Sequence, residues 1–169
     1  MEITRTNATK SSSVAFFALV HNPVKFRLFL LKNLPAAYFS GLKINEVSEE
    51  KCTVSVPYKW FTRNPFRSTY FACLSMAAEM STGILSMANT YQRSPKISLL
   101  VIGIEGKFFK KATGTTSFIC GEGQSIRQAI ERAIQTSAPQ TVKVLSSGFN
   151  NQNEPVAEFW ITWSFKVKQ

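Results

Sequence analysis

Residues 64–85 read NPFRSTYFACLSMAAEMSTGIL, and they set a constraint that the rest of the chain must meet. From Ser68 to Gln92 a single charged residue, Glu79, stands among small and apolar side chains. Such a run predicts a long helix that the domain buries over most of its circumference. An ionised carboxylate inside an apolar helix is costly to bury unless another group pairs with it. Glu79 therefore needs an explanation.

The surroundings of Glu79 offer two explanations. Ser75 and Gly83 lie four positions to either side of it, so they share its helix face, and small or polar residues there would leave space for a ligand. In that case Glu79 is a functional group. Alternatively, Glu79 is structural and forms an ion pair in the core. The cations that could pair with it are Lys59, Arg63 and Arg67.

Asn64 and Pro65 stand at the start of this stretch. Asn is among the preferred N-cap residues and Pro is favoured at the first helical position, so the pair predicts where the central helix begins. A catalytic role for Asn64 is the alternative to capping, and the two roles are compatible.

The composition indicates one basic domain. The 169 residues suffice for a single domain with a core and are few for two. There are 20 Lys and Arg against 10 acidic residues, all of them Glu, which gives a net charge of +10. This excess suggests an anionic partner, either nucleic acid, a lipid head group or a phosphorylated small molecule, or else simply a basic surface. Basic and aromatic residues do not interleave in a known binding motif, so nucleic acid is not expected.

The N-terminal segment and the cysteines bear on the compartment. Residues 1–13 are dominated by Thr, Asn, Lys and Ser, which predicts a disordered tail, and residues 14–169 then form the single domain. The apolar run 14–20 is short, and the sequence contains no uninterrupted run of about eighteen apolar residues. A transmembrane span is therefore not expected. Three widely spaced cysteines and one His predict buried free thiols in a reducing, cytoplasmic compartment and no metal site.

Periodicity predicts an α+β fold. A helix that begins at Pro23 is ended by Pro35, and an amphipathic helix covers 124–136. Alternating polar and apolar residues predict strands at 41–47, 51–57 and 156–167. Strands are also predicted at 96–109, at 115–120, which is β-branched and aromatic, and at 142–149. The last strand has aromatic residues on both faces and is therefore expected inside the sheet or at an interface. This order favours one curved antiparallel sheet of about five to seven strands wrapped around the long central helix.

Residues 23–168 resemble the hotdog fold, in which an antiparallel sheet wraps a long hydrophobic helix. The chain is similar to the PaaI-like branch of the acyl-CoA thioesterases, and specifically to a subgroup with a Glu on the central helix. Such enzymes have an Asn before the helix and an acidic residue fifteen positions later, which is the separation of Asn64 and Glu79. The segments FFKKATG (108–114) and VAEFWITWSFKV (156–167) also resemble elements of this family.

The resemblance implies a site for thioester chemistry. Glu79 would be the general base or the nucleophile, and Asn64 would hold the attacking water or the thioester carbonyl. The backbone N–H of Phe71, near the helix N-terminus, would stabilise the developing oxyanion. Further contacts to the substrate would come from Tyr70, Ser75 and Gly83. The phosphates of coenzyme A would meet Lys107, Lys110 and Lys111.

The resemblance also implies an assembly. In this fold the sites are shared between subunits, so a homodimer or tetramer is expected. The substrate or ligand would be an acyl thioester of coenzyme A or of a carrier protein, with no other cofactor. Tyr70-Phe71 stands where the family has His-Gly, and Phe places a large side chain where Gly lets a substrate approach the backbone. The alternative is therefore a non-catalytic acyl- or lipid-binding protein of the same fold, which leaves enzymatic activity open.

Overall fold

The computed structural model describes residues 14–168, so the predicted tail at 1–13 lies outside the described residues. Helices cover Pro23–Asn33 (α2), Pro35–Ser40 (α3), Phe71–Thr90 (α4) and Gly123–Thr136 (α5), with a helical segment at Val14–Val20 before them. A short 3-10 helix, η1, covers Trp60–Thr62. Strands cover Lys43–Val47 (β1), Cys52–Val56 (β2), Ile97–Phe108 (β3), Thr116–Cys120 (β4), Gln140–Phe149 (β5) and Pro155–Val167 (β6).

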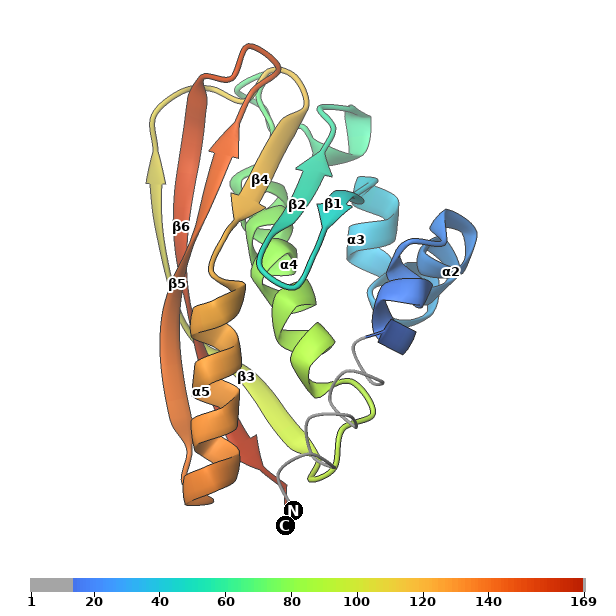
Figure 1. Ribbon diagram of the computed structural model, residues 1–169. Helices are drawn as coiled ribbons and strands as arrows, with labels where there is room; N and C mark the ends of the chain where they lie inside the picture. The colour runs from blue at the N-terminus through green and yellow to red at the C-terminus, as the bar shows by residue number, and fades with distance from the viewer. Residues whose placement is uncertain (1–13, 169) are drawn as a thin grey trace.

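Within residues 14–168 the strands form one antiparallel sheet of six, in the order β1-β2-β4-β5-β6-β3. The sheet curves around α4, as Figure 1 shows. The predicted α+β architecture, an antiparallel sheet wrapped around one long helix, is therefore confirmed. β6 lies between β5 and β3, which also confirms that the last strand is an interior one. The long strand β3 is left at the edge of the sheet.

The central helix α4 packs against the concave face of the sheet. Its apolar side chains meet the inward faces of β2 and β4, where Val54, Val56 and Phe118 are fully buried. By length and hydropathy α4 resembles a membrane-spanning helix, but most of it is buried inside this fold, so it is the core helix of the domain. The three cysteines are free and buried, as the sequence predicts.

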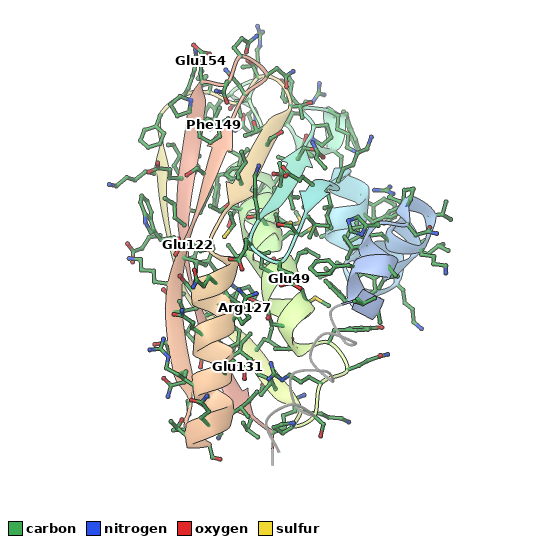
Figure 2. All side chains as sticks on the ribbon, in the orientation of Figure 1. Glu49, Glu122, Arg127, Glu131, Phe149 and Glu154 are labelled. Carbon is green, nitrogen blue, oxygen red and sulfur yellow. The ribbon has the colours of Figure 1, made fainter. Side chains whose placement is uncertain are left out.

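Helix α5 lies beside α4 and covers β5 and β6. Its apolar face, with Ile126 and Ile130 fully buried, packs against α4, β5 and β6. Its N-terminus is fixed to the turn between β1 and β2, because the N–H of Gly123 donates to the carbonyl of Glu50 at 3.1 Å. Arg127 on the next turn pairs with Glu49 at 3.5 Å and with Glu50, and Figure 2 shows Arg127 pointing toward Glu49.

The first helix ends before Pro35, as predicted. A second, short helix that was not predicted, α3, begins at Pro35, and Gly41 ends it in the left-handed conformation at a φ of 76°. The predicted start of the central helix is wrong. The central helix begins at Phe71, not at Pro65, so Asn64 is not its N-cap. Asn64 instead closes a turn, in which its Oδ1 accepts hydrogen bonds from the N–H groups of Phe66 at 3.0 Å and Ser68 at 3.2 Å. Asn is favoured in turns as well as at helix N-caps, so the same residue in the sequence fits either structure.

Candidate active site

Glu79 lies on the one face of α4 that this chain leaves partly open. Most of the helix is buried, but a row of side chains at helical spacing is only partly covered. The members of this row are Ala72, Ser75, Met76, Glu79, Met87 and Thr90. Ser75, one of the two predicted neighbours of Glu79, belongs to this row. Gly83 is next to it and is buried.

The carboxylate of Glu79 has no hydrogen-bond or ion-pair partner among residues 14–168, so the structural alternative of an ion pair with Lys59, Arg63 or Arg67 does not hold. Burial raises the pKa of the Glu79 carboxyl, because the charged form loses solvation and gains no compensating contact. A carboxyl group held this way can take up a proton at a higher pH than an ordinary Glu, which suits it to act as a base.

Gly83 and Trp163 shape the space beside this carboxylate. A Cβ placed on Gly83 would lie 3.1 Å from Oε1 of Glu79 and 3.5 Å from the indole ring of Trp163. The missing side chain thus lets the carboxylate and the indole approach the helix together. Trp163 comes from β6, and its register partner on β3 is Val101. The carboxylate therefore lies on the side of α4 that faces β6 and the edge strand β3.

The start of α4 carries a different set of predicted groups. The rings of Tyr70 and Phe71 contact each other edge to face at 5.0 Å between centroids, and the Phe71 side chain is 57% exposed. In the described chain no acceptor lies within hydrogen-bond distance of the Phe71 N–H, as is usual for the first turn of a helix. The Phe71 N–H is therefore free to donate a hydrogen bond to a ligand, but the large aromatic ring of Phe71 lies next to it.

The structure does not bring Asn64 or Phe71 to Glu79 within one chain. Glu79 lies eight residues after Phe71, which is about 12 Å along the helix axis. Both ends of the Asn64 amide are used in the turn at 64–68, since Nδ2 donates to Oγ of Ser68 at 3.1 Å. The fifteen-residue spacing predicted that Asn64 and Glu79 act together. Within a single chain the structure does not bring these two side chains together.

The three predicted phosphate-binding lysines lie at the end of β3 and just after it, and they have different surroundings. Lys107 lies with its Nζ 5.2 Å from the centroid of the Trp160 ring. Lys110 forms an ion pair of 2.6 Å with Glu154, a residue of the turn between β5 and β6. Lys111 is exposed. Lys110 is therefore engaged within the chain, and Lys107 and Lys111 are the more accessible cations of the set.

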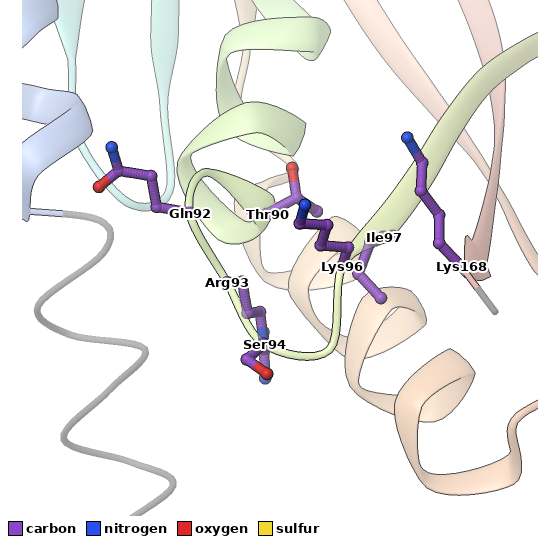
Figure 3. A pocket seen from close by; sticks show the side chains of 7 residues that line it. All are labelled: Thr90, Gln92, Arg93, Ser94, Lys96, Ile97 and Lys168. Carbon is purple, nitrogen blue, oxygen red and sulfur yellow. The ribbon is translucent and has the colours of Figure 1, made fainter.

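One concave feature was not predicted. A pocket of about 430 Å³ lies where α4 ends and β3 begins, shown in Figure 3. Its lining residues are Thr90, Gln92, Arg93, Ser94, Lys96, Ile97 and Lys168. Arg93 is held by Glu131 of α5 at 2.7 Å, whereas Lys96 and Lys168 are exposed. The lining combines the segment from Thr90 to Ile97 with Lys168 after β6, and the antiparallel pairing of β3 with β6 brings them together.

The solved structures that this chain resembles share its fold. A protein of unknown function from Pseudomonas aeruginosa, described as a probable thioesterase, is 19% identical, with a TM-score of 0.73, over 86% of this chain and 97% of that one. The PaaI protein of E. coli, from a phenylacetic acid degradation operon, is 14% identical, with a TM-score of 0.60, over 89% and 96%. A thioesterase from Haemophilus influenzae is 13% identical, with a TM-score of 0.57, over 83% and 88%.

These similarities establish the hotdog fold, as the resemblance implied, and at these identities they establish the fold alone. A comparison with curated proteins finds no match. The sequence itself matches one family over most of the domain, from the second turn of α2 to near the end of β6. The chain belongs to the family described as Domain of unknown function (DUF4442), which matches residues 26–165.

Proposed function

We propose that this protein hydrolyses an acyl thioester and that Glu79 activates the attacking water. One observation carries this proposal: the only charged residue of the buried helix α4 has no partner among residues 14–168 and lies on the helix face that these residues leave partly open. The names of structural relatives, two of which are thioesterases by description, give the class of reaction.

The chemistry follows from the position of this carboxylate. As a general base, ionised Glu79 takes a proton from water while the water oxygen attacks the thioester carbonyl carbon. The tetrahedral intermediate then collapses, the C–S bond breaks, and the leaving sulfur takes the proton. As a nucleophile, Glu79 would instead form an acyl anhydride that water hydrolyses in a second step. In either route the Phe71 N–H is the proposed donor to the oxyanion, and Tyr70, Ser75 and Gly83 border the acyl group.

A second copy of the chain would complete this site. The edge strand β3 exposes four apolar side chains beside unpaired backbone groups, namely Leu100, Ile102, Ile104 and Phe108. The register irregularity between Val101 and Gly103 puts Ile104 and Phe108 on the face of the sheet that carries Trp163, and Leu100 on the opposite face. Long exposed edge strands of this kind pair readily with another strand. Pairing with the same strand of a second copy would continue the sheet and cover Ile104 and Phe108, which share a face with Trp163. A homodimer, or a tetramer built from it, could then place the Phe71 N–H of one subunit near Glu79 of the other.

The proposed substrate carries its acyl group on a thiol, and either coenzyme A or an acyl carrier protein could supply this thiol. We propose coenzyme A, with Lys107 and Lys111 as the cations that meet its phosphates and with Lys110 joining them once Glu154 releases it. An acyl carrier protein would also fit the net charge of +10, because such a partner would bind through an acidic surface. Asn64 holds the loop before α4, and it would hold the water or the carbonyl only if its amide left the turn. The free buried thiols accord with a reducing compartment, and cytoplasmic location stays a prediction.

A cysteine nucleophile is not part of this proposal. Burial raises the pKa of Cys120 to about 11, and burial likewise raises the pKa of Cys52 and Cys73. Thiols in such surroundings are chiefly protonated at neutral pH and react slowly.

A non-catalytic acyl-binding protein is the second candidate. The exposed ring of Phe71 stands at the start of α4, where the related enzymes have the Gly of His-Gly, and this ring would obstruct the approach of a thioester carbonyl to the backbone. A binder would still use the open face of α4 to hold an acyl chain.

The two candidates separate in one experiment. Release of free thiol is followed for a panel of acyl-CoA chain lengths with the wild-type chain, Glu79→Gln, and the control Glu158→Gln, which changes a half-buried Glu on β6. We expect turnover by the wild type and by Glu158→Gln, and a loss of at least about a hundredfold in Glu79→Gln. Equal rates in all three would remove Glu79 from the mechanism. Stoichiometric acyl-CoA binding without turnover would identify the protein as a binder.

A further inference from the structure

Helix α2 has apolar residues on both of its faces, although the fold uses only one. Phe26 and Leu30 face inward and are buried. Val24, Leu28 and Leu31 recur at i, i+4 and i+7, so they form one stripe on the opposite, solvent face. Val24 is 67% exposed and Leu28 is 61% exposed. Packing of the domain explains the inner face but leaves the outer stripe without a function.

Basic side chains border this stripe on both sides. At 100° per residue, Lys25 and Lys32 lie on one flank of Val24, Leu28 and Leu31, and Arg27 lies on the other. The guanidinium of Arg27 is held 3.9 Å from the centroid of the Tyr38 ring on α3. Between Glu2 and Glu46 the sequence contains no acidic residue. The charged residues of α2 and of the chain on either side of it are therefore all basic.

Helix α2 is already folded at the surface of the domain. Asn22 caps its first turn, because Oδ1 accepts a hydrogen bond from the N–H of Lys25 at 3.0 Å. Figure 1 shows α2 at the side of the molecule that carries α3 and β1, away from the edge strand β3. Its outer stripe is thus separate from the strand that we assign to pairing of two copies. A preformed helix also binds without an ordering cost in conformational entropy.

We propose that α2 docks the protein onto an anionic lipid bilayer, with the stripe Val24, Leu28 and Leu31 entering the head-group region. Aliphatic residues flanked by Lys and Arg are typical of helices that lie in a membrane interface, since the apolar stripe enters the acyl boundary while the cations meet lipid phosphates. A bilayer requires no shape complementarity, which suits a convex helix face without a groove. The anionic cytoplasmic leaflet attracts basic segments within about a Debye length.

Flotation with vesicles tests this proposal in the full-length protein. The probes are vesicles of phosphatidylcholine alone and of phosphatidylcholine mixed with phosphatidylglycerol. We expect the wild type to float with the anionic vesicles, to bind weakly to the neutral ones, and to lose binding as salt rises. Leu28→Ser should reduce binding by roughly tenfold, because it removes apolar area from the contact. The double variant Lys25→Glu with Lys32→Glu should abolish the preference for anionic vesicles.

Matched controls lie on other elements. Trp60 on η1 is 76% exposed, so Trp60→Ser also replaces an exposed apolar side chain by Ser, outside both α2 and the strand assigned to pairing. Lys96→Glu with Lys166→Glu changes the net charge by the same amount at exposed sites near the start of β3 and the end of β6. Both controls should bind anionic vesicles as the wild type does, and circular dichroism should confirm that every variant is folded.

Two results would overturn the proposal. One is absence of wild-type binding to the anionic vesicles, or an equal loss of binding in Leu28→Ser and Trp60→Ser. The other is a change of oligomeric state in Leu28→Ser, measured by light scattering, without any vesicle binding by the wild type. The stripe would then be a contact between copies of the chain, or with another protein, and not a membrane-docking surface.

Discussion

The indole N–H of Trp163 donates a hydrogen bond of 2.9 Å to Oγ1 of Thr82, and this bond joins β6 to α4 in the buried interior. The same Oγ1 donates to the backbone carbonyl of Glu79 at 2.8 Å. Thr82 thus connects the sheet to the helical turn that carries the proposed base. Because Trp163 also borders the space beside the Glu79 carboxylate, stability and site geometry are linked at this point.

Replacing Thr82 by Val should destabilise the fold. Val keeps the branched shape but offers no acceptor, so the buried indole N–H is left unpaired at a cost of about 1–3 kcal/mol. The check is urea unfolding followed by Trp fluorescence and circular dichroism. Thr90→Val on the same helix is the control, since Oγ1 of Thr90 bonds only carbonyls of its own helix and the change should stay within about 0.5 kcal/mol. Equal effects at both positions would contradict a special role for the Trp163 bond.

Replacing Gly83 by Ala should separate stability from activity. Ala favours a helix interior over Gly by about 1 kcal/mol, which offsets mild crowding by a flexible carboxylate. The new Cβ would nevertheless lie 3.1 Å from Oε1 of Glu79, so this oxygen must move. We expect an unfolding free energy equal to or slightly above that of the wild type, together with a lower rate of thioester hydrolysis. An unchanged rate would mean that the carboxylate position tolerates this shift.

The raised pKa of Glu79 predicts how stability depends on pH. A carboxyl that holds its proton more tightly in the folded state makes the fold lose stability as pH rises from the unfolded pKa to the folded pKa. Below that window both states are protonated and the penalty vanishes. Glu79→Gln stays neutral, so it should match the wild type in acid and become the more stable protein towards neutral pH. Urea midpoints across this range test the sign, and Glu158→Gln controls for net charge.

The arrangement around Gly123 predicts a large effect from a small side chain. A Cβ at this position would lie 2.1 Å from the carbonyl oxygen of Glu49 and 2.7 Å from Cα of Glu50, and neither backbone atom can move without the turn. Gly123→Ala should therefore cost about 1–3 kcal/mol or more, although it adds a helix-favouring residue. Gly121→Ala, where a Cβ would meet nothing within 4 Å, should be nearly neutral. Thermal melting of the two variants provides the comparison.

Much of the fold could be predicted because its signals are local. Alternation and residue composition placed all six strands within a few residues, and the long apolar stretch predicted α4. The start of α4 could not be placed, because Asn64 and Pro65 fit a turn and a helix start equally well. The choice depended on hydrogen bonds to Phe66 and Ser68 that only the folded loop supplies. The short helix α3 has too few residues to show a period.

The candidate site was predicted only in part for a similar reason. A single charge in an apolar helix is visible in any sequence, so Glu79 could be identified. The ion pair of Lys110 with Glu154 joins residues 44 positions apart, and only the return of the last strand along the sheet brings them together. The pocket beneath α4 likewise depends on Lys96 and Lys168, which adjoin the paired strands β3 and β6.

Asn64 offers the sharpest test of what this loop contributes. Asn64→Asp keeps an oxygen that accepts the N–H groups of Phe66 and Ser68, so the turn should persist and unfolding should shift by no more than about 0.5 kcal/mol. Asn64→Ala removes the acceptor and should cost about 1–2 kcal/mol.

If Asn64 only positions the loop that carries the Phe71 N–H, thioester hydrolysis should follow stability in both variants, with activity kept in Asn64→Asp and reduced in Asn64→Ala. The two measurements are urea unfolding and thiol release under the same conditions. A folded, stable Asn64→Asp that has lost activity would contradict this role. The amide Nδ2 would then have to leave Ser68 and contact the substrate itself, which requires the turn to open during the reaction.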